Sequence, residues 1–269
     1  IVLKQSIVGG IAQGGIIDTP EGKWYGMLFE DHGAVGRIPY VIPIIWKEDW
    51  PIFDDVYDTG IISEKIKYSF VDSDEFDENK NELKLVWQWN HNPDNNNWSL
   101  TEQPGCLRLR NGRKSINILD AVNILTQRTV GPKCSGSIKI DVSNMKNGDY
   151  AGLAAFQQKY GFVGIKMENG IKYIVMISGS SGCDKEMGNI PISQNEVYFK
   201  IDFDYENLSD SAYFYYSLSG YVWNKIGNKL KLEYTIPHFV GYRFGLFNYA
   251  TKEIGGYVDF DYFRIEQNI

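Results

Sequence analysis

The sequence has no long uninterrupted apolar run, no stripe of basic residues and no paired cysteines. Its apolar stretches are broken by prolines and fall far short of the roughly 20 residues that span a bilayer, and no signal-peptide pattern is visible. The net charge is −7, with 27 Lys and Arg against 34 Asp and Glu. Because binding a phosphate backbone needs clustered positive charge, the composition argues against nucleic acid as a partner, and the lack of an apolar span argues against a membrane.

Cysteine is scarce. Cys106, Cys134 and Cys183 are widely spaced, and none forms a Cys-x-x-Cys pair or lies near a histidine. We therefore expect neither a disulfide framework nor a zinc site, and we predict three reduced thiols that pack as small apolar groups. The sequence leaves the compartment open, and we favour a cytoplasmic location over a secreted one.

The composition allows a large core. Of the 269 residues, 43% are hydrophobic and 14% aromatic, which suits one or two domains. A boundary falls between Trp50 and Phe76, where the chain becomes acidic and turn-prone and apolar residues become sparse. We predict a first domain over residues 1–53, a linker over 54–72 and a second domain over 73–269. A start at Ile1, in an apparent mid-strand, is typical of a trimmed product.

The first domain is predicted to contain a β-hairpin. Two apolar or aromatic runs, residues 13–18 and 23–29, flank Thr-Pro-Glu-Gly, in which proline presets φ for a turn and glycine supplies a positive φ. A glycine-rich loop follows, between His32 and Arg37, and its lack of bulky side chains lets the backbone approach a neighbour or a ligand.

After this loop, residues 38–46 resume an apolar run. Pro39 and Pro43 confine that run to an edge strand or a broken strand. Residues 1–53 thus offer roughly three or four strands, about as many as one propeller blade contains. A single blade cannot bury its own faces, so it needs partners, and a strand at residues 1–10 would be an open edge.

The second domain is predicted to be almost wholly β. In residues 197–204 the odd-numbered side chains are apolar and the even-numbered ones mostly charged, as in a strand with one face on a core. About a dozen such runs without a helical period predict two stacked antiparallel sheets, a β-sandwich of the concanavalin A type. The runs cover residues 106–110, 123–130, 135–142, 153–156, 162–167, 173–177, 197–205, 212–218, 229–234, 243–248 and 258–265.

These features resemble glycoside hydrolase family 43. Residues 9–37 are similar to the closing part of the family's propeller domain, and several sandwich motifs are similar to the C-terminal domain of its β-xylosidases and arabinofuranosidases. Those motifs are Ser73-Asp74-Glu75-Phe76, Trp87-Gln88-Trp89-Asn90-His91-Asn92-Pro93, Trp98-Ser99-Leu100, Pro104-Gly105-Cys106-Leu107-Arg108-Leu109, Gln127-Arg128-Thr129 and Val258-Asp259-Phe260-Asp261-Tyr262-Phe263-Arg264. The resemblance implies an all-β chain, a concanavalin A-like β-sandwich preceded by the final strands of a five-bladed β-propeller.

The resemblance also implies a function. The chain would be part of a hydrolase that removes xylose or arabinofuranose from xylan or arabinoxylan by inversion, which needs two carboxyl groups about 6.5 to 9.5 Å apart. In the family these acids come from earlier blades, which would precede Ile1. We therefore assign no catalytic residue to this chain, and we expect the N-terminal propeller portion of the same protein and xylan or arabinoxylan oligosaccharides as its partners.

Two alternatives stay open for the sandwich. It could be a non-catalytic xylan-binding module that stacks exposed rings on sugars, for which Trp89, Trp98, Tyr160 and Tyr221 are available. It could instead only clamp the propeller shut and contact no sugar.

Three site residues are carried over from the family. Arg37 matches an arginine on the floor of the sugar pocket, and its guanidinium can donate several hydrogen bonds. Phe239 matches an aromatic residue that the sandwich lends to the pocket rim. His32 matches a position that coordinates a metal or a water on the propeller axis, and calcium would be the metal; a packing role is the alternative.

Four carboxylates could form a second calcium site. They come from the first and last predicted strands of the sandwich and could meet there, since calcium favours clustered oxygens; the alternative is solvated strand residues. These residues are Asp74, Glu75, Asp259 and Asp261.

Overall fold

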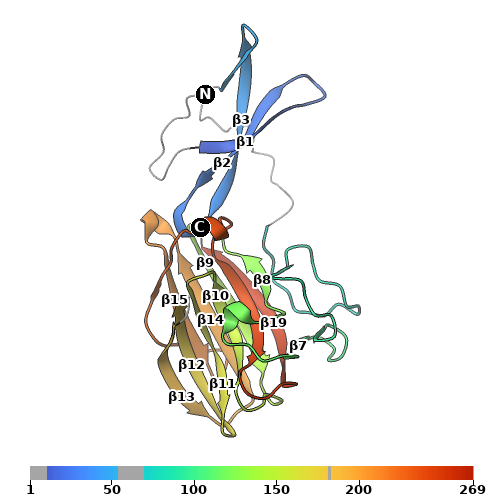
Figure 1. Ribbon diagram of the computed structural model, residues 1–269, viewed down its shortest axis with the longest axis vertical. Helices are drawn as coiled ribbons and strands as arrows, with labels where there is room; N and C mark the ends of the chain where they lie inside the picture. Colours follow the sequence, from blue (N-terminus) through green and yellow to red (C-terminus); the bar gives the residue numbers. More distant parts are fainter. Residues whose placement is uncertain (1–10, 54–69, 181–182, 269) are drawn as a thin grey trace. The chain divides into compact units, whose positions relative to one another are not determined.

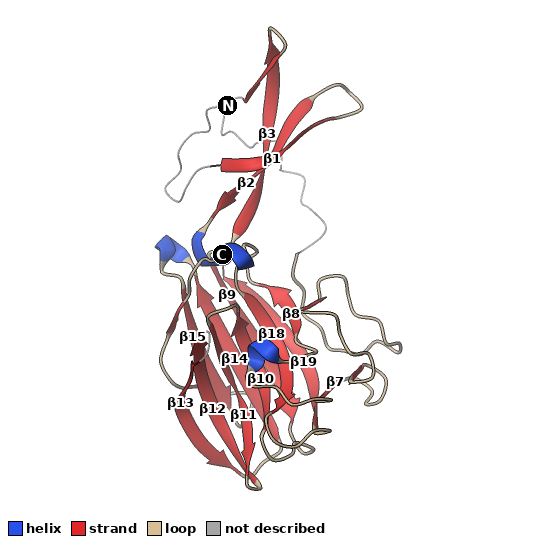
Figure 2. Cartoon of the chain, in the orientation of Figure 1, coloured by secondary structure: helices blue, strands red, loops and turns tan. Residues whose placement is uncertain are grey.

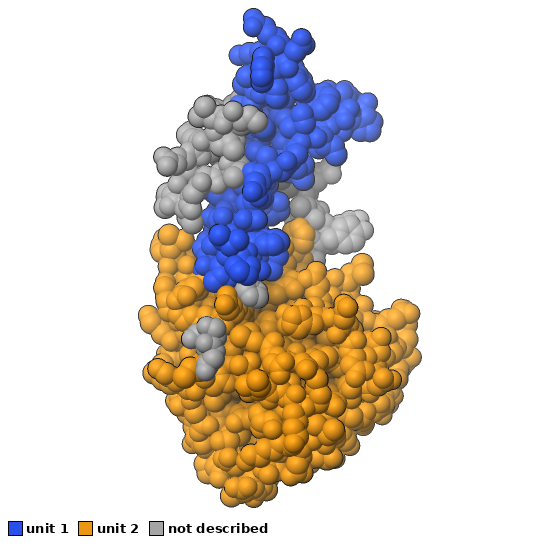
Figure 3. Space-filling view, viewed as in Figure 1, with its two compact units in different colours: residues 1–69, 234–241 blue, residues 70–233, 242–269 orange. Residues whose placement is uncertain are grey.

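The computed structural model describes residues 11–53, 70–180 and 183–268, and these residues form β-strands and short 3₁₀ turns (Figures 1 and 2). The chain divides into two compact units (Figure 3). Unit 1 consists of residues 1–69 and 234–241, and unit 2 of residues 70–233 and 242–269. The strand expected at residues 1–10 and all but the last three residues of the expected linker lie outside the described residues.

Unit 1 contains an antiparallel sheet of four strands in which each strand pairs with the next. The strands are β1 (Ile11–Asp18), β2 (Trp24–Asp31), β3 (Arg37–Lys47) and β4 (Trp50–Phe53). The predicted hairpin of β1 and β2 is confirmed: Asp18 pairs with Trp24, and in the turn Gly22 has φ 76° and donates its N–H to the Thr19 carbonyl at 2.8 Å.

Strand β3 runs unbroken through both of its prolines. Pro39 and Pro43 pair with Phe29 and Tyr25 of β2, whereas β4 joins β3 only from Ile44 onward. The prolines therefore lie where β3 has a single neighbour among the described strands. Because no described strand pairs with the other edge of β3 at these positions, the missing N–H groups of the prolines cost no inter-strand hydrogen bond there.

Unit 2 consists of two antiparallel sheets (Figure 1). The seven-stranded sheet has the order β13 (Cys183–Ile192), β12 (Ile171–Ser180), β11 (Tyr160–Glu168), β10 (Asp149–Phe156), β18 (Arg243–Ala250), β8 (Leu125–Arg128), β5 (Gln88–Trp89). The eight-stranded sheet has the order β16 (Asn224–Lys225), β15 (Ser211–Ser217), β14 (Glu196–Asp204), β9 (Lys133–Asp141), β19 (Tyr257–Asn268), β7 (Leu107–Arg110), β6 (Trp98–Ser99), and β17 (Leu230–Lys231) pairs with β15. The 3₁₀ turns η2 (Ile118–Asp120) and η3 (Glu206–Leu208) belong to unit 2, and η1 (Gly33–Val35) and η4 (Ile236–His238) belong to unit 1.

The core lies between these two sheets. In β14 the odd-numbered apolar side chains from Val197 to Phe203 are at most 2% exposed, while the intervening polar ones are half-buried, as the alternation predicts. The ring of Phe203 meets Phe244 of β18 edge to face at 4.9 Å, and Phe244 meets Phe263 of β19 at 5.4 Å. These contacts join the two sheets face to face, so the predicted sandwich is confirmed.

Strand β10 is buried on both faces, one of them by a second apolar cluster. Leu153 and Ala155 are fully buried, and so is Ala154, whose side chain points to the opposite face. Ala154 packs with Ile118 of η2 and with Phe162 of β11. No helical turn in the described ranges is long and apolar enough to cross a membrane.

Two expectations about the predicted second domain are wrong. Residues 229–234 do not form a full strand: β17 ends at Lys231, and Pro237 then favours the 3₁₀ turn η4. Cys183 is not packed but exposed on β13, whereas Cys106 is half-buried and Cys134 is buried, all three as free thiols.

Candidate functional site

The turn between β2 and β3 presents the predicted site residues of unit 1. Asp31 and Arg37 lie opposite each other at the end of the β2–β3 ladder and close a five-residue loop. Within the loop the His32 N–H donates to the Gly36 carbonyl, and the Gly36 N–H donates to the Gly33 carbonyl, both at 3.0 Å. These bonds fix the backbone from which Arg37 projects.

The segment 234–241 of the same unit lies against this turn. The backbone N–H of Arg37 donates to the carbonyl of Phe239 at 2.9 Å. The guanidinium carbon of Arg37 lies 4.9 Å from the centre of the Phe239 ring and 4.2 Å from that of Phe29. Two aromatic rings therefore flank the guanidinium, an arrangement that stabilises the cation.

The carboxylate of Asp31 binds the Nε atom of this guanidinium. Oδ1 of Asp31 accepts a hydrogen bond from Nε of Arg37 at 3.0 Å and another from the hydroxyl of Tyr234 at 2.9 Å. Burial acts to lower the pKa of Arg37, but the hydrogen bonds with Asp31 and Tyr234 outweigh it and raise that pKa. Burial and the bond to Asp31 raise the pKa of Tyr234, which keeps its hydroxyl a donor.

The arrangement suits a polar, uncharged ligand. With Nε bound to Asp31, the terminal nitrogens of Arg37 can donate to hydroxyl oxygens. Phe239 is 46% exposed, so part of its ring can contact an apolar sugar face. Arg37 and Phe239, which sequence reasoning singled out separately, thus lie in one site.

His32 has two polar neighbours. Its Nε2 lies 3.0 Å from Oε2 of Glu30 and 3.1 Å from the hydroxyl of Tyr40, whose ring it stacks on. The described residues contain no group of three or more His, Cys, Asp or Glu side chains that could hold a metal ion. Calcium takes six to eight oxygen ligands, so these neighbours alone do not make a calcium site. The metal role of His32 stays a prediction.

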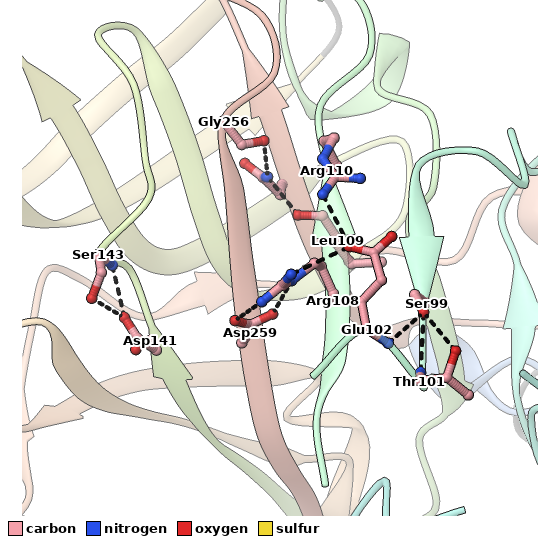
Figure 4. Close-up of polar contacts among 11 residues, drawn as sticks. Ser99, Thr101, Glu102, Arg108, Leu109, Arg110, Asp141, Ser143, Gly256 and Asp259 are labelled. Atoms are coloured by element: carbon pink, nitrogen blue, oxygen red, sulfur yellow. Dashed lines mark hydrogen bonds and ion pairs between the residues drawn. The ribbon is translucent and has the colours of Figure 1, made fainter. Parts of the chain in front are cut away.

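The four acidic residues of the sandwich do not gather around one point. Arg108 binds Asp259 through two nitrogens, Nε at 2.7 Å and Nη2 at 2.8 Å (Figure 4). The other three acids have separate partners: Asp74 accepts from the indole of Trp87 at 2.8 Å, Glu75 binds Arg264 at 2.8 Å, and Asp261 lies 3.2 Å from Lys139. Of the two interpretations, the shared calcium site is not supported: the described residues contain no group of three or more His, Cys, Asp or Glu side chains that could hold a metal ion, and each of these carboxylates has a nitrogen donor nearby.

The aromatic residues considered for sugar binding differ in exposure. Tyr160 is 1% exposed, so it cannot stack on a sugar; it is buried by the cluster around η2, and its hydroxyl binds Asp184. Trp89 and Trp98 are half-buried and contact each other, with ring centres 5.3 Å apart. Tyr221 is 89% exposed.

Sequence reasoning missed three residues of the Arg37 site. Asp31 could have been found, since the hairpin register places the two residues that bracket a short loop opposite each other. Phe29 follows from the same register, two positions earlier on the same face. Tyr234 left no such signal, because nothing local links it to β2.

The chain consists of a lectin-like β-sandwich and a small four-stranded antiparallel sheet. The candidate site lies in unit 1 and combines an arginine with aromatic rings. The family described as beta xylosidase C-terminal concanavalin A-like domain matches residues 73–266, and the chain belongs to this family.

Several proteins are similar over nearly the whole chain. A solved structure of a bifunctional GH43-CE protein from Bacteroides eggerthii is 54% identical, with a TM-score of 0.89 over 97% of this chain and 34% of its own. A GH43 glycoside hydrolase engineered to display both endo-xylanase and exo-arabinofuranosidase activity is 30% identical, with a TM-score of 0.86 over 97% of this chain and 55% of its own. A beta-xylosidase from Formosa agariphila is 28% identical over 95% of this chain and 48% of its own length. The chain thus spans about half the length of that curated relative.

Proposed function

We propose that this chain is part of a family-43 glycoside hydrolase that cleaves xylosidic or arabinofuranosidic bonds of xylan or arabinoxylan, with Arg37 and Phe239 in its sugar-binding pocket. The relatives described above support the substrate class. The single observation that carries the site is that the guanidinium of Arg37 lies over the rings of both Phe29 and Phe239. Its terminal nitrogens are the donors for sugar hydroxyls.

The carboxyl groups that transfer protons are proposed to belong to a propeller portion of the same protein, of which the sheet of unit 1 is one part. Among the described acids of unit 1, Glu30 faces His32, and Asp31 is bound to Arg37 and Tyr234. Asp18 is exposed at the end of β1. Inversion requires one carboxyl group to protonate the leaving oxygen and a second to activate water, and we assign neither role to these three residues.

The test uses the full-length protein that contains this chain. It should release xylose or arabinose from xylo-oligosaccharides or arabinoxylan, and NMR should show the product with inverted anomeric configuration. Arg37→Ala should lower kcat/KM by about 100-fold, as expected when a preorganised donor is removed. The control Arg113→Ala removes an arginine of unit 2 that pairs with Asp120 and should have little effect.

Two outcomes would contradict the proposal. If the full-length protein hydrolyses neither substrate, the assigned activity is wrong. If it does hydrolyse them but Arg37→Ala behaves like Arg113→Ala, the activity stands and the site is wrong.

A further inference from the structure

We propose that Asp31 and Tyr234 are positioning residues that orient the guanidinium of Arg37 toward the sugar. This inference rests on the proposed function, because it requires that Arg37 binds substrate. It adds a residue, Tyr234, that lies far from the turn in sequence and that neither the hairpin register nor the family resemblance indicated.

The β-ladder sets the position of the carboxylate. Asp31 pairs directly with Arg37, and Phe29 pairs with Pro39 two positions along the same ladder. Because side chains alternate across a strand, Phe29, Asp31 and Arg37 share one face of the sheet. The register therefore delivers one ring and one carboxylate to the same arginine.

The aromatic rings and the carboxylate of Asp31 restrict different motions of the guanidinium of Arg37. The rings of Phe29 and Phe239 lie 4.2 and 4.9 Å from its central carbon and restrict its tilt. The bond from Nε to Asp31, at 3.0 Å, restricts its rotation in its own plane. Together they hold the guanidinium in one orientation, so its terminal nitrogens meet the ligand already oriented.

Tyr234 fixes the carboxylate in turn. Its hydroxyl donates to Oδ1 of Asp31, the same oxygen that accepts from Nε of Arg37. An aspartate that accepts two donors on one oxygen cannot rotate without breaking both bonds. Because a phenol titrates at about pH 10, this donor persists across the neutral pH range.

The experiment measures kcat/KM of the full-length enzyme on xylo-oligosaccharides together with its thermal midpoint. Tyr234→Phe keeps the ring and removes one neutral donor, and it should lower kcat/KM about threefold to tenfold. Asp31→Asn should lower it about tenfold to hundredfold, because the bond it weakens is charge-assisted. Matched controls are Tyr213→Phe in unit 2 and Asp18→Asn at the exposed end of β1; both should retain full activity.

A double-mutant cycle separates positioning from a general structural role. If Asp31 acts through Arg37, adding Asp31→Asn to Arg37→Ala should cause no further loss of kcat/KM. Losses that multiply in the double variant would overturn the inference, because Asp31 would then act independently of the arginine.

The failure of this inference is distinguishable from failure of the proposed function. If Arg37→Ala lowers kcat/KM but Tyr234→Phe and Asp31→Asn match their controls, only the positioning role is wrong. If Arg37→Ala itself has no effect, the proposed sugar site is wrong. Should Asp31→Asn lower the thermal midpoint strongly, Tyr234→Phe, which preserves the packed ring, decides the question.

Discussion

The backbones of Gly36 and Gly241 lie in close contact within unit 1. A Cβ atom added to Gly36 would lie 2.5 Å from the amide nitrogen of Gly241, and one added to Gly241 would lie 2.2 Å from the carbonyl oxygen of Val35. Both glycines also have positive φ, 94° and 79°. A side chain at either position would push the backbone that carries Phe239 away from the turn that carries Arg37.

We therefore expect Gly241→Ala to damage the Arg37 site more than its φ strain alone explains. The matched control is Gly22→Ala, whose glycine has φ 76° but nothing within 4 Å of an added Cβ. Left-handed strain should destabilise both variants by about 1 to 2 kcal/mol. Only Gly241→Ala should lower kcat/KM of the full-length enzyme, by about tenfold or more, because it displaces the ring that flanks the guanidinium. Equal activity of the two variants would contradict this.

The hairpin and the sandwich could be predicted from local patterns. Alternation in residues 197–204 identified β14, and the turn chemistry of Gly22 identified the β1–β2 hairpin. Strand β13 was missed because it is a polar strand at the edge of its sheet, where one face and one backbone edge are open to water and no apolar alternation is required.

The candidate site was predictable only in part. Arg37 and Phe239 could be named from the family motif, but their contact depends on how segment 234–241 packs, which no local pattern encodes. For the carboxylates of the sandwich, sequence reasoning grouped residues that bind different partners. Asp259 and Asp74 were grouped because their strands were expected to meet, but the identity of the nearest donor, Arg108 or the Trp87 indole, decides their role.

Asp149 should make the stability of unit 2 depend on pH. Its side chain is fully buried, Oδ2 accepts the N–H of Lys146 at 2.7 Å, and Oδ1 has no hydrogen-bond partner among the described residues. Burial raises the pKa of Asp149 to about 6. The folded protein thus binds this proton more tightly than the unfolded chain, in which aspartate titrates near pH 4. The contribution of Asp149 to stability should be complete below about pH 4 and should fall, by up to about 3 kcal/mol, as the pH rises to 6.

Asp149→Asn tests this dependence, because an amide cannot ionise. Urea unfolding at pH 4, 5, 6 and 7 should show a smaller loss of stability between pH 4 and 6 in the variant than in the wild type. The control Asp18→Asn, at an exposed position, should follow the wild type. Parallel curves for the wild type and Asp149→Asn would show that the buried carboxyl does not titrate in this range.

The three thiols should react at different rates. Cys183 is exposed on an edge strand, whereas burial raises the pKa of Cys106 to about 11 and that of Cys134 to about 12. Because the thiolate is the reactive form, a thiol reagent at pH 8 should modify Cys183 quickly and the other two only after unfolding. Counting labels by intact mass checks this, and Cys183→Ser should abolish the fast phase. Fast modification of two sites in the native protein would contradict the burial of Cys106 or Cys134.

Trp89 and Trp98 should form a structural clasp, that is, a ring contact that holds the edges of the two sheets together. Trp89 belongs to β5 at the edge of the seven-stranded sheet, Trp98 belongs to β6 at the edge of the eight-stranded sheet, and their rings meet at 5.3 Å. The indole N–H of Trp98 is also bound, to Oδ1 of Asn95 at 2.9 Å. Removing either ring should therefore open the sandwich at this edge, with a loss of about 1 to 3 kcal/mol in the free energy of unfolding.

Single and double alanine variants of the pair, measured by denaturant unfolding, test the clasp. The double variant should lose less than the sum of the single variants, by about 0.5 to 1.5 kcal/mol, because the rings stabilise each other. Tyr221→Ala is the control, since that side chain is 89% exposed and its loss should change stability by less than about 0.5 kcal/mol. Calorimetry with xylo-oligosaccharides separates the clasp from a sugar platform. If Trp89→Ala keeps full stability but abolishes the heat of binding, the ring contacts sugar instead of holding the sheets together, and the xylan-binding module is the better description of unit 2.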